Sequence, residues 1–207
     1  ISVLQSGTLD FETTPSYSLE VTVTDGGGLT GTATVTVSLT DVNEPPTVAD
    51  AALSVDENSA EGSAVGTVVG SDVDAGQTLV YSITAGDPSE VFRIDPTSGA
   101  LTVRRSELGG SAALNFEESE RNAFSLTVTV TDNGEGGLTD AATVTIAVDD
   151  LNEAPTLADA ALSVDENSAE GSAVGTVVGS DVDAGQSLTY SITAGDPSEV
   201  FRIDPTS

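Results

Sequence analysis

Carboxylates and amides crowd a short connector that occurs twice in this 207-residue chain. It reads Asp41-Val42-Asn43-Glu44-Pro45-Pro46, and it returns as Asp150-Leu151-Asn152-Glu153-Ala154-Pro155. Each copy follows an alternating Thr/Val-rich run, and its proline must end the strand because proline lacks a backbone donor and fixes φ. The connector is rich in carboxylate, amide and carbonyl oxygens, the ligands that calcium prefers. We therefore predict a calcium-binding hinge between two sandwich domains.

A second oxygen-rich motif carries two aspartates two residues apart. It is Ser71-Asp72-Val73-Asp74-Ala75-Gly76, with a copy at 180–185. In a bent loop, such a pair can hold one ion from two sides. An EF-hand does not fit, because the position of its bidentate glutamate falls on Ile83 and no helical pattern flanks the loop. The alternative is a pair of solvated turn aspartates, so the calcium hypothesis depends on the other acids nearby.

The composition excludes several classes of function. The chain has 34 acidic and 5 basic residues, a net charge of −29, and no Cys, His, Met or Trp. This charge argues against nucleic acid and anionic membranes as partners. The absence of Cys and His argues against structural zinc and excludes a His-activated nucleophile. We find no signal peptide and no apolar run long enough for membrane insertion.

Paired carboxylates could in principle hydrolyse glycosides. Here they recur in duplicate at the expected domain ends, without aromatic residues that would line a cleft. We therefore predict that the protein is not an enzyme.

The chain contains an internal repeat. Residues 47–98 and 156–207 differ only at Val48/Leu157, Thr78/Ser187 and Val80/Thr189. Residues 1–46 match the second half of the repeat, since Leu9-Asp10-Phe11-Glu12 aligns with Leu114-Asn115-Phe116-Glu117. We expect the C-terminal half of one domain at 1–46, a complete domain with its linker at 47–155, and the N-terminal half of a third at 156–207. This organisation is typical of a segment of a longer array.

Alternating apolar and polar residues predict strands and no helix. Within the complete repeat, the candidates lie around 50–55, 63–69, 78–84, 91–94, 100–104, 124–131 and 139–148. Seven short strands separated by dense turn signals indicate an all-β, Greek-key sandwich of immunoglobulin-like architecture. The eight aromatic residues fall at strand or strand-edge positions, so we expect them to pack in cores. A half domain by itself would leave unpaired strand edges and an open core.

Taken in order, the motifs resemble the cadherin repeat family in its bacterial cadherin-like form. The resemblance covers essentially the whole chain. It is carried by Val55-Asp56-Glu57-Asn58, Asp72-Val73-Asp74-Ala75-Gly76 followed by Tyr81-Ser82-Ile83, Phe92-Arg93-Ile94-Asp95, Gly99-Ala100-Leu101-Thr102, Leu9-Asp10-Phe11-Glu12, Val23-Thr24-Asp25 and the Asp-x-Asn-Glu connector. It implies tandem sandwiches with Ca²⁺ held between successive repeats.

The resemblance also implies a set of metal ligands at each junction. The first junction would use Asp10, Glu12, Asp41, Asn43, Glu44, Asp72, Asp74 and Asp132. The second would use Glu57, Glu117, Asp150, Asn152, Glu153, Asp181 and Asp183. The connector departs from the family's usual Asp-x-Asn-Asp-Asn, because Glu44 replaces the second aspartate and one residue is missing. We expect two or three ions at the first junction and fewer at the second.

These features predict an extracellular or cell-surface segment that calcium stiffens into a stalk or an adhesion element. Its carboxylates would repel one another without a cation and would be bridged with one. The expected partners are calcium, neighbouring repeats of the same or an identical chain, and a cell-surface protein or polysaccharide. Two alternatives stay open. One is a carbohydrate- or self-binding module, and the other is a subunit that polymerises head to tail into a filament by completing split domains.

Overall fold

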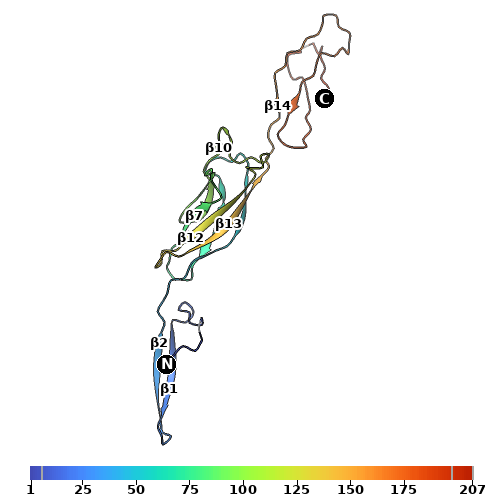
Figure 1. Cartoon of the computed structure of the whole chain (residues 1–207). Coiled ribbons are helices and arrows are strands. Elements are labelled where there is room, and N and C mark those ends of the chain that lie inside the picture. The colour runs from blue at the N-terminus through green and yellow to red at the C-terminus, as the bar shows by residue number, and fades with distance from the viewer. Residues whose placement is uncertain (6, 197, 207) are drawn as a thin grey trace.

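The computed structural model describes residues 1–5, 7–196 and 198–206. The molecule is elongated, with a hairpin at one end, a two-sheet sandwich in the middle and a segment with few strands at the other end (Figure 1). All regular structure in the described residues is β-strand, which confirms the all-β prediction. Consequently none of it is a helix that could cross a bilayer. The boundaries at 46 and 155 stay predictions, and Ser6, Pro197 and Ser207 lie outside the described residues.

The central sandwich contains the seven predicted strands in two sheets. The four-stranded sheet has the spatial order β4 (Ala51–Asp56), β13 (Thr139–Asp149), β12 (Ala123–Thr131) and β7 (Val80–Ala85). The three-stranded sheet has the order β5 (Ala64–Thr67), β9 (Ala100–Val103) and β8 (Phe92–Ile94). Strand β4 runs parallel to β13, and the other pairings in these sheets are antiparallel. The predicted sandwich class is thereby confirmed.

Two short strand pairs complete this domain. Strand β3 (Thr47–Val48) pairs with β6 (Gly70–Ser71), and β10 (Glu107–Leu108) pairs with β11 (Ser111–Ala112). The β10–β11 hairpin was not predicted, because two-residue strands are too short to show an alternating pattern. Its turn is Gly109-Gly110, and both glycines have positive φ, +64° and +90°.

The core of the sandwich follows from the period-2 pattern of its two longest strands. Leu126, Val128 and Val144 belong to one buried cluster, while the intervening residues of β12 and β13 are more exposed. Phe92 lies in this cluster and meets Phe124 edge to face, with ring centroids 4.9 Å apart. The expectation that every aromatic packs in a core is wrong for Phe116 and Phe201, whose exposed fractions are 41% and 51%.

The terminal segments show the unpaired edges that were expected of half domains. The N-terminal hairpin joins β1 (Ser16–Thr24) to β2 (Thr30–Ser38), and these strands pair only with each other among the described residues. In the described part of the C-terminal segment there is one pair, β14 (Thr156–Leu157) with β15 (Gly179–Ser180). As far as the structure describes them, both segments therefore lack the second layer that covers the sheets of the central domain.

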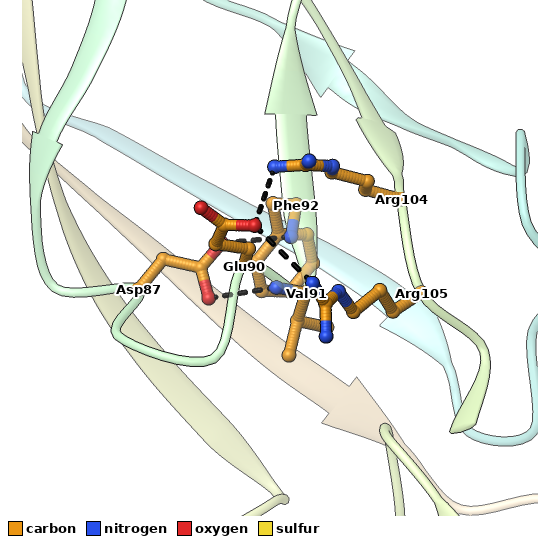
Figure 2. A network of polar contacts seen from close by, with 6 residues as sticks. All are labelled: Asp87, Glu90, Val91, Phe92, Arg104 and Arg105. Carbon is orange, nitrogen blue, oxygen red and sulfur yellow. Dashed lines mark hydrogen bonds and ion pairs between the residues drawn. The ribbon is translucent and has the colours of Figure 1, made fainter. Parts of the chain in front are cut away.

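A polar network fixes the turn between β7 and β8 (Figure 2). The carboxylate of Asp87 accepts hydrogen bonds from the N–H groups of Val91 and Phe92, both at 2.8 Å. Arg104 and Arg105 form ion pairs with Glu90 at 2.9 and 3.3 Å. These ion pairs are half-exposed, so they contribute little stability, whereas the Asp87 contacts satisfy backbone donors where β8 begins.

Candidate metal centre

Four carboxylates meet where the N-terminal hairpin joins the sandwich. One oxygen from each of Glu12, Asp41, Glu44 and Asp74 lies within 4.8 Å of the others. Glu12 precedes β1, Asp41 and Glu44 lie in the connector after β2, and Asp74 lies in the bend after β6. The group thus takes its oxygens from both sides of the connector, as a site that joins two units would.

Backbone amides position the two aspartates of this bend. Asp72 Oδ1 accepts the N–H of Asp74 at 2.9 Å, and Asp74 Oδ2 accepts the N–H of Glu44 at 3.0 Å. Gly76 closes the bend with a φ of +87°, a conformation that side chains disfavour. The second contact holds the bend and the connector together, so these two segments present their oxygens to the same place.

Asn43 links the middle of the connector to the residues that directly follow β12. Its Nδ2 donates to Asp132 Oδ2 at 3.1 Å and to the carbonyl of Glu135 at 3.2 Å. Its Oδ1 accepts a hydrogen bond from Gln77 Nε2. Asp132 is buried but does not belong to the four-carboxylate group. A hydrogen bond therefore joins Asn43 and Asp132 directly to each other.

Gln77 is a part of this site that the sequence analysis did not identify. Its counterpart Gln186 makes the same contact at the second junction, donating to Asn152 Oδ1 at 2.5 Å and to Asp183 Oδ2 at 3.0 Å. The available signal was the position of both glutamines, each directly after the glycine that ends the aspartate motif.

The second junction, between the sandwich and the C-terminal segment, contains two overlapping groups of three carboxylates. One is formed by Glu57, Glu117 and Glu153, and the other by Glu117, Asp150 and Asp183. Within each group, one oxygen from every residue lies within 4.8 Å of the others. Five of the seven residues predicted for this junction are thereby brought together.

Buried Glu57 links two segments of the second junction through hydrogen bonds. Its Oε2 accepts the N–H of Phe116 at 3.0 Å, and its Oε1 accepts the N–H of Leu151 at 2.9 Å. The N–H of Glu153 donates to Asp183 Oδ2 at 3.0 Å, repeating the contact between Glu44 and Asp74. Both junctions therefore use the same link between connector and bend.

Several predicted ligands lie outside the carboxylate groups. Asp10 accepts hydrogen bonds from the N–H and hydroxyl of Thr13, at 3.1 and 2.7 Å, and these contacts lower the pKa of Asp10. Asp181 Oδ1 accepts the N–H of Asp183 at 3.1 Å. Asp72 and Asp132 are likewise absent from these groups. The ligand assignment of each predicted residue stays a prediction.

Buried carboxylate oxygens without a hydrogen-bond partner occur at both junctions. Within the described residues, no hydrogen-bond partner meets the following atoms: Glu44 Oε2, Asp72 Oδ2 and Asp74 Oδ1 at the first junction, and Glu153 Oε2 and Asp183 Oδ1 at the second. Asp74 and Asp183 are each only 7% exposed. An unpaired buried carboxylate is costly, and a hard cation with six to eight oxygen ligands would satisfy these atoms. The residues present therefore fit calcium.

The closeness of the junction carboxylates raises the pKa values of several of them. Loss of hydration, followed by the charge of Asp74, raises the pKa of Glu44. Loss of hydration likewise raises the pKa of Asp150 and Glu153, with further contributions from Asp183 and Glu57 respectively. Both junctions thus hold carboxylates whose charged form is disfavoured by their neighbours, a condition that a bound cation would reverse.

The comparisons with known proteins identify the same repeat. The family model described as "Cadherin domain" matches residues 51–149. Mouse Cadherin-24 is 38% identical over 197 residues, which cover 86% of this chain and 24% of that protein. Human Protocadherin-17 is 34% identical over 229 residues, covering 100% of this chain and 19% of that protein. The chain therefore spans about a quarter or less of the length of these relatives, which are animal proteins and do not support the bacterial form.

A solved structure shows the same likeness in three dimensions. The protocadherin gammaB7 EC3-6 cis-dimer structure aligns with a TM-score of 0.69 and 26% identity, covering 96% of this chain and 50% of that one. The similarity extends over the connectors as well as the sandwich, since nearly the whole chain aligns.

Proposed function

This chain belongs to the cadherin repeat family, and on that premise we propose that it is a spacer or adhesion segment whose junctions are stiffened by calcium. Members of this family are extracellular adhesion proteins and not enzymes. This agrees with the expected extracellular location and with the expectation that the protein is not an enzyme. The protocadherin gammaB7 structure is a cis-dimer. For this chain we propose the general role of such proteins, which is to contact neighbouring repeats and other cadherin chains.

The observation that carries the proposal is the set of unpartnered carboxylate oxygens at both junctions. At the first, Glu44 Oε2 and Asp74 Oδ1 are buried without a donor, although a backbone hydrogen bond already holds the two residues together. Solvated turn aspartates, the alternative interpretation, would keep their oxygens in water. Burial of these atoms instead indicates a site arranged to receive a cation.

The proposed calcium ligands at the first junction come from three segments of the chain. Asp72 and Asp74 would approach the ion from the sandwich, Glu12 from the preceding segment, and Asp41 and Glu44 from the connector. Calcium, when bound, supplies the positive charge and accepts oxygens from all three sources. The three segments are then held in one orientation, because each contributes to the same coordination sphere.

Small-angle scattering tests this proposal. Extrapolated to zero protein concentration, the radius of gyration should rise when calcium replaces chelator, because bent conformations of a flexible string give way to a rod. Sodium at equal ionic strength should not reproduce the change. An unchanged radius of gyration would overturn the proposal.

Calorimetric calcium titration tests the ligand assignment. The double variant Asp72→Asn/Asp74→Asn should lose binding at the first junction and retain it at the second, which uses separate residues. The matched control, Glu20→Gln/Glu61→Gln, removes the same two charges at exposed residues outside the carboxylate groups and should bind as the parent does. Full retention of every site in the Asn variant would show that the assignment is wrong.

A further inference from the structure

A pair of side-chain amides lies beside the carboxylates of the first junction. The pair consists of Gln77, between β6 and β7, and Asn43, in the connector. Gln77 Nε2 donates a hydrogen bond to Asn43 Oδ1, so the pair joins the aspartate bend to the connector. Gln186 Nε2 makes the same contact with Asn152 Oδ1 at the second junction. The contact therefore recurs wherever the same local sequence occurs.

The other hydrogen bonds of Asn43 fix which way the Gln77 amide faces. Asn43 Nδ2 donates to Asp132 Oδ2 at 3.1 Å and to the carbonyl of Glu135 at 3.2 Å, and both of these oxygens are acceptors. Asn43 Oδ1 is therefore the atom that faces Gln77, and only an N–H group of Gln77 can donate to it. This leaves Gln77 Oε1 to take a different partner.

Gln77 Oε1 is buried, and no hydrogen-bond partner meets it within the described residues. The other buried oxygens in this condition at the first junction are Glu44 Oε2, Asp72 Oδ2 and Asp74 Oδ1. Gln77 Oε1 is thus the uncharged member of a set that is otherwise carboxylate. Burial of an amide oxygen without a donor costs free energy, as burial of a carboxylate oxygen does. A cation that satisfies the three carboxylates would satisfy this oxygen as well.

The loop after β12 holds the amide pair in place. Gly134 N–H donates to Asp132 Oδ1 at 3.0 Å, while Asp132 Oδ2 accepts from Asn43. A Cβ atom on Gly134 would overlap Asn43 Oδ1 and would lie 2.7 Å from Gln77 Nε2. Glycine at this position is therefore what lets both amides pack against the loop. A side chain that is already held at its amide loses little further freedom when its oxygen takes a ligand.

We propose that Gln77 is a further calcium ligand at the first junction, through Oε1. This assignment rests on the proposed calcium site and adds to it a residue that no acidic motif indicates. Amide oxygens are among the ligands that calcium accepts, and its shell needs six to eight oxygens. A neutral ligand fills one of these positions without adding negative charge to a junction that already gathers four carboxylates.

Two substitutions at residue 77 separate a ligand from a residue that only donates a hydrogen bond. Gln77→Met removes both the oxygen and the N–H groups, whereas Gln77→Glu removes the N–H groups and keeps an oxygen. In calorimetric calcium titration, Gln77→Met should weaken binding at the first junction by about tenfold or more, and Gln77→Glu should recover most of that loss. The matched control, Gln5→Met, changes an exposed glutamine outside the junctions and should leave binding unchanged.

Europium luminescence counts the coordinated water molecules, with europium(III) as the probe in place of calcium. When a protein oxygen leaves the shell of the ion, a water molecule takes its position. Luminescence lifetimes in light and heavy water should therefore indicate about one more coordinated water molecule per chain for Gln77→Met than for the parent. Gln77→Glu and Gln5→Met should show no such gain. This measurement does not depend on whether the bound ion stiffens the chain.

The unfolding transition of the central sandwich in chelator is the control for folding, and it should stay cooperative because Gln77 lies outside the hydrophobic core. Equal losses of affinity in Gln77→Met and Gln77→Glu, or an unchanged water count in Gln77→Met, would overturn the ligand assignment, since Gln77 would then act only through its hydrogen bond. If the parent and every variant bind calcium alike, the assignment fails while the proposed function stands. A parent chain that binds no calcium overturns both.

Discussion

At the residue scale, short-range hydrogen bonds shape the loops that carry the carboxylates. Tyr81 is an example, because its hydroxyl accepts the N–H of Gly70 at 3.0 Å and so ties β7 to the segment just before the aspartate bend. Tyr190 makes the same contact with Gly179, also at 3.0 Å, although it stands in a segment without a closed core. Contacts between residues close in sequence thus form in both copies, whatever surrounds them.

The two tyrosines provide a matched pair of variants. Tyr81→Phe should lower the free energy of unfolding of the central sandwich by about 1 kcal/mol, because the N–H of Gly70 loses its acceptor. Tyr190→Phe removes the same contact outside that sandwich and should leave its transition unchanged. Urea unfolding followed by circular dichroism measures both. A larger effect from Tyr190→Phe would contradict this assignment of the two bonds.

At the scale of elements, a strand's environment decides whether it forms. Residues 51–56 form β4 by pairing in parallel with β13, yet residues 160–165, which have the same sequence, form no strand. The turn that Asp87 organises does persist, because Asp196 accepts the N–H groups of Val200 and Phe201 at 3.0 and 2.7 Å. Turns are satisfied locally, whereas strands need a neighbour to take up their backbone groups.

Truncation of the same side chain in two copies measures this difference. Phe92→Ala should destabilise the central sandwich by about 3–5 kcal/mol, because it opens a cavity beside Phe124. Phe201→Ala, at an exposed copy of the position, should change that transition by less than about 0.5 kcal/mol. Differential scanning calorimetry resolves the two. Equal losses would mean that the C-terminal segment packs as the central domain does.

At the scale of the whole molecule, electrostatic repulsion opposes the aligned, folded chain. The net charge is −29, and each junction gathers carboxylates whose oxygens lie within 4.8 Å of one another. The pKa values of Asp150 and Glu153 are raised, first by loss of hydration and then by neighbouring carboxylates. Metal-free protein should therefore be sensitive to pH at its junctions.

The sign of this sensitivity follows from proton linkage. A carboxyl group whose pKa is higher when folded binds more protons in the folded state, so stability falls as pH rises through the interval between its usual and its raised pKa. In chelator, the melting temperature of the central domain should therefore rise as pH falls through the raised pKa values of these groups towards the ordinary carboxyl range near about 4. Calcium should flatten this dependence, and so should Glu153→Gln. A metal-free melting temperature that falls steadily with acidification would contradict it.

Much of the fold could be predicted because its signals are local. The alternation along 124–131 and 139–148 predicts strands with one buried face, and the glycines and prolines mark where these strands end. The recurrence of Asp-x-Asp and of the connector likewise indicated acids at both junctions. The β10–β11 hairpin was missed because two-residue strands are too short to show an alternating pattern. The contacts of Gln77 were missed although Gln77 and Gln186 hold the same place after the glycine of the aspartate motif, because only the structure shows that this amide reaches Asn43.

The sequence by itself determined the repeat, the strand positions of the central domain, the turns and the charge that junction cations would have to balance. Only the tertiary structure decided which acids meet, because Glu12, Asp41, Glu44 and Asp74 approach one another through a connector and a bend that lie far apart in sequence. It also decided which copy of a sequence is folded. Val91 is buried and Val200 is exposed although their neighbours along the chain are the same, since burial needs a partner sheet and, within the described residues, only the central copy has one.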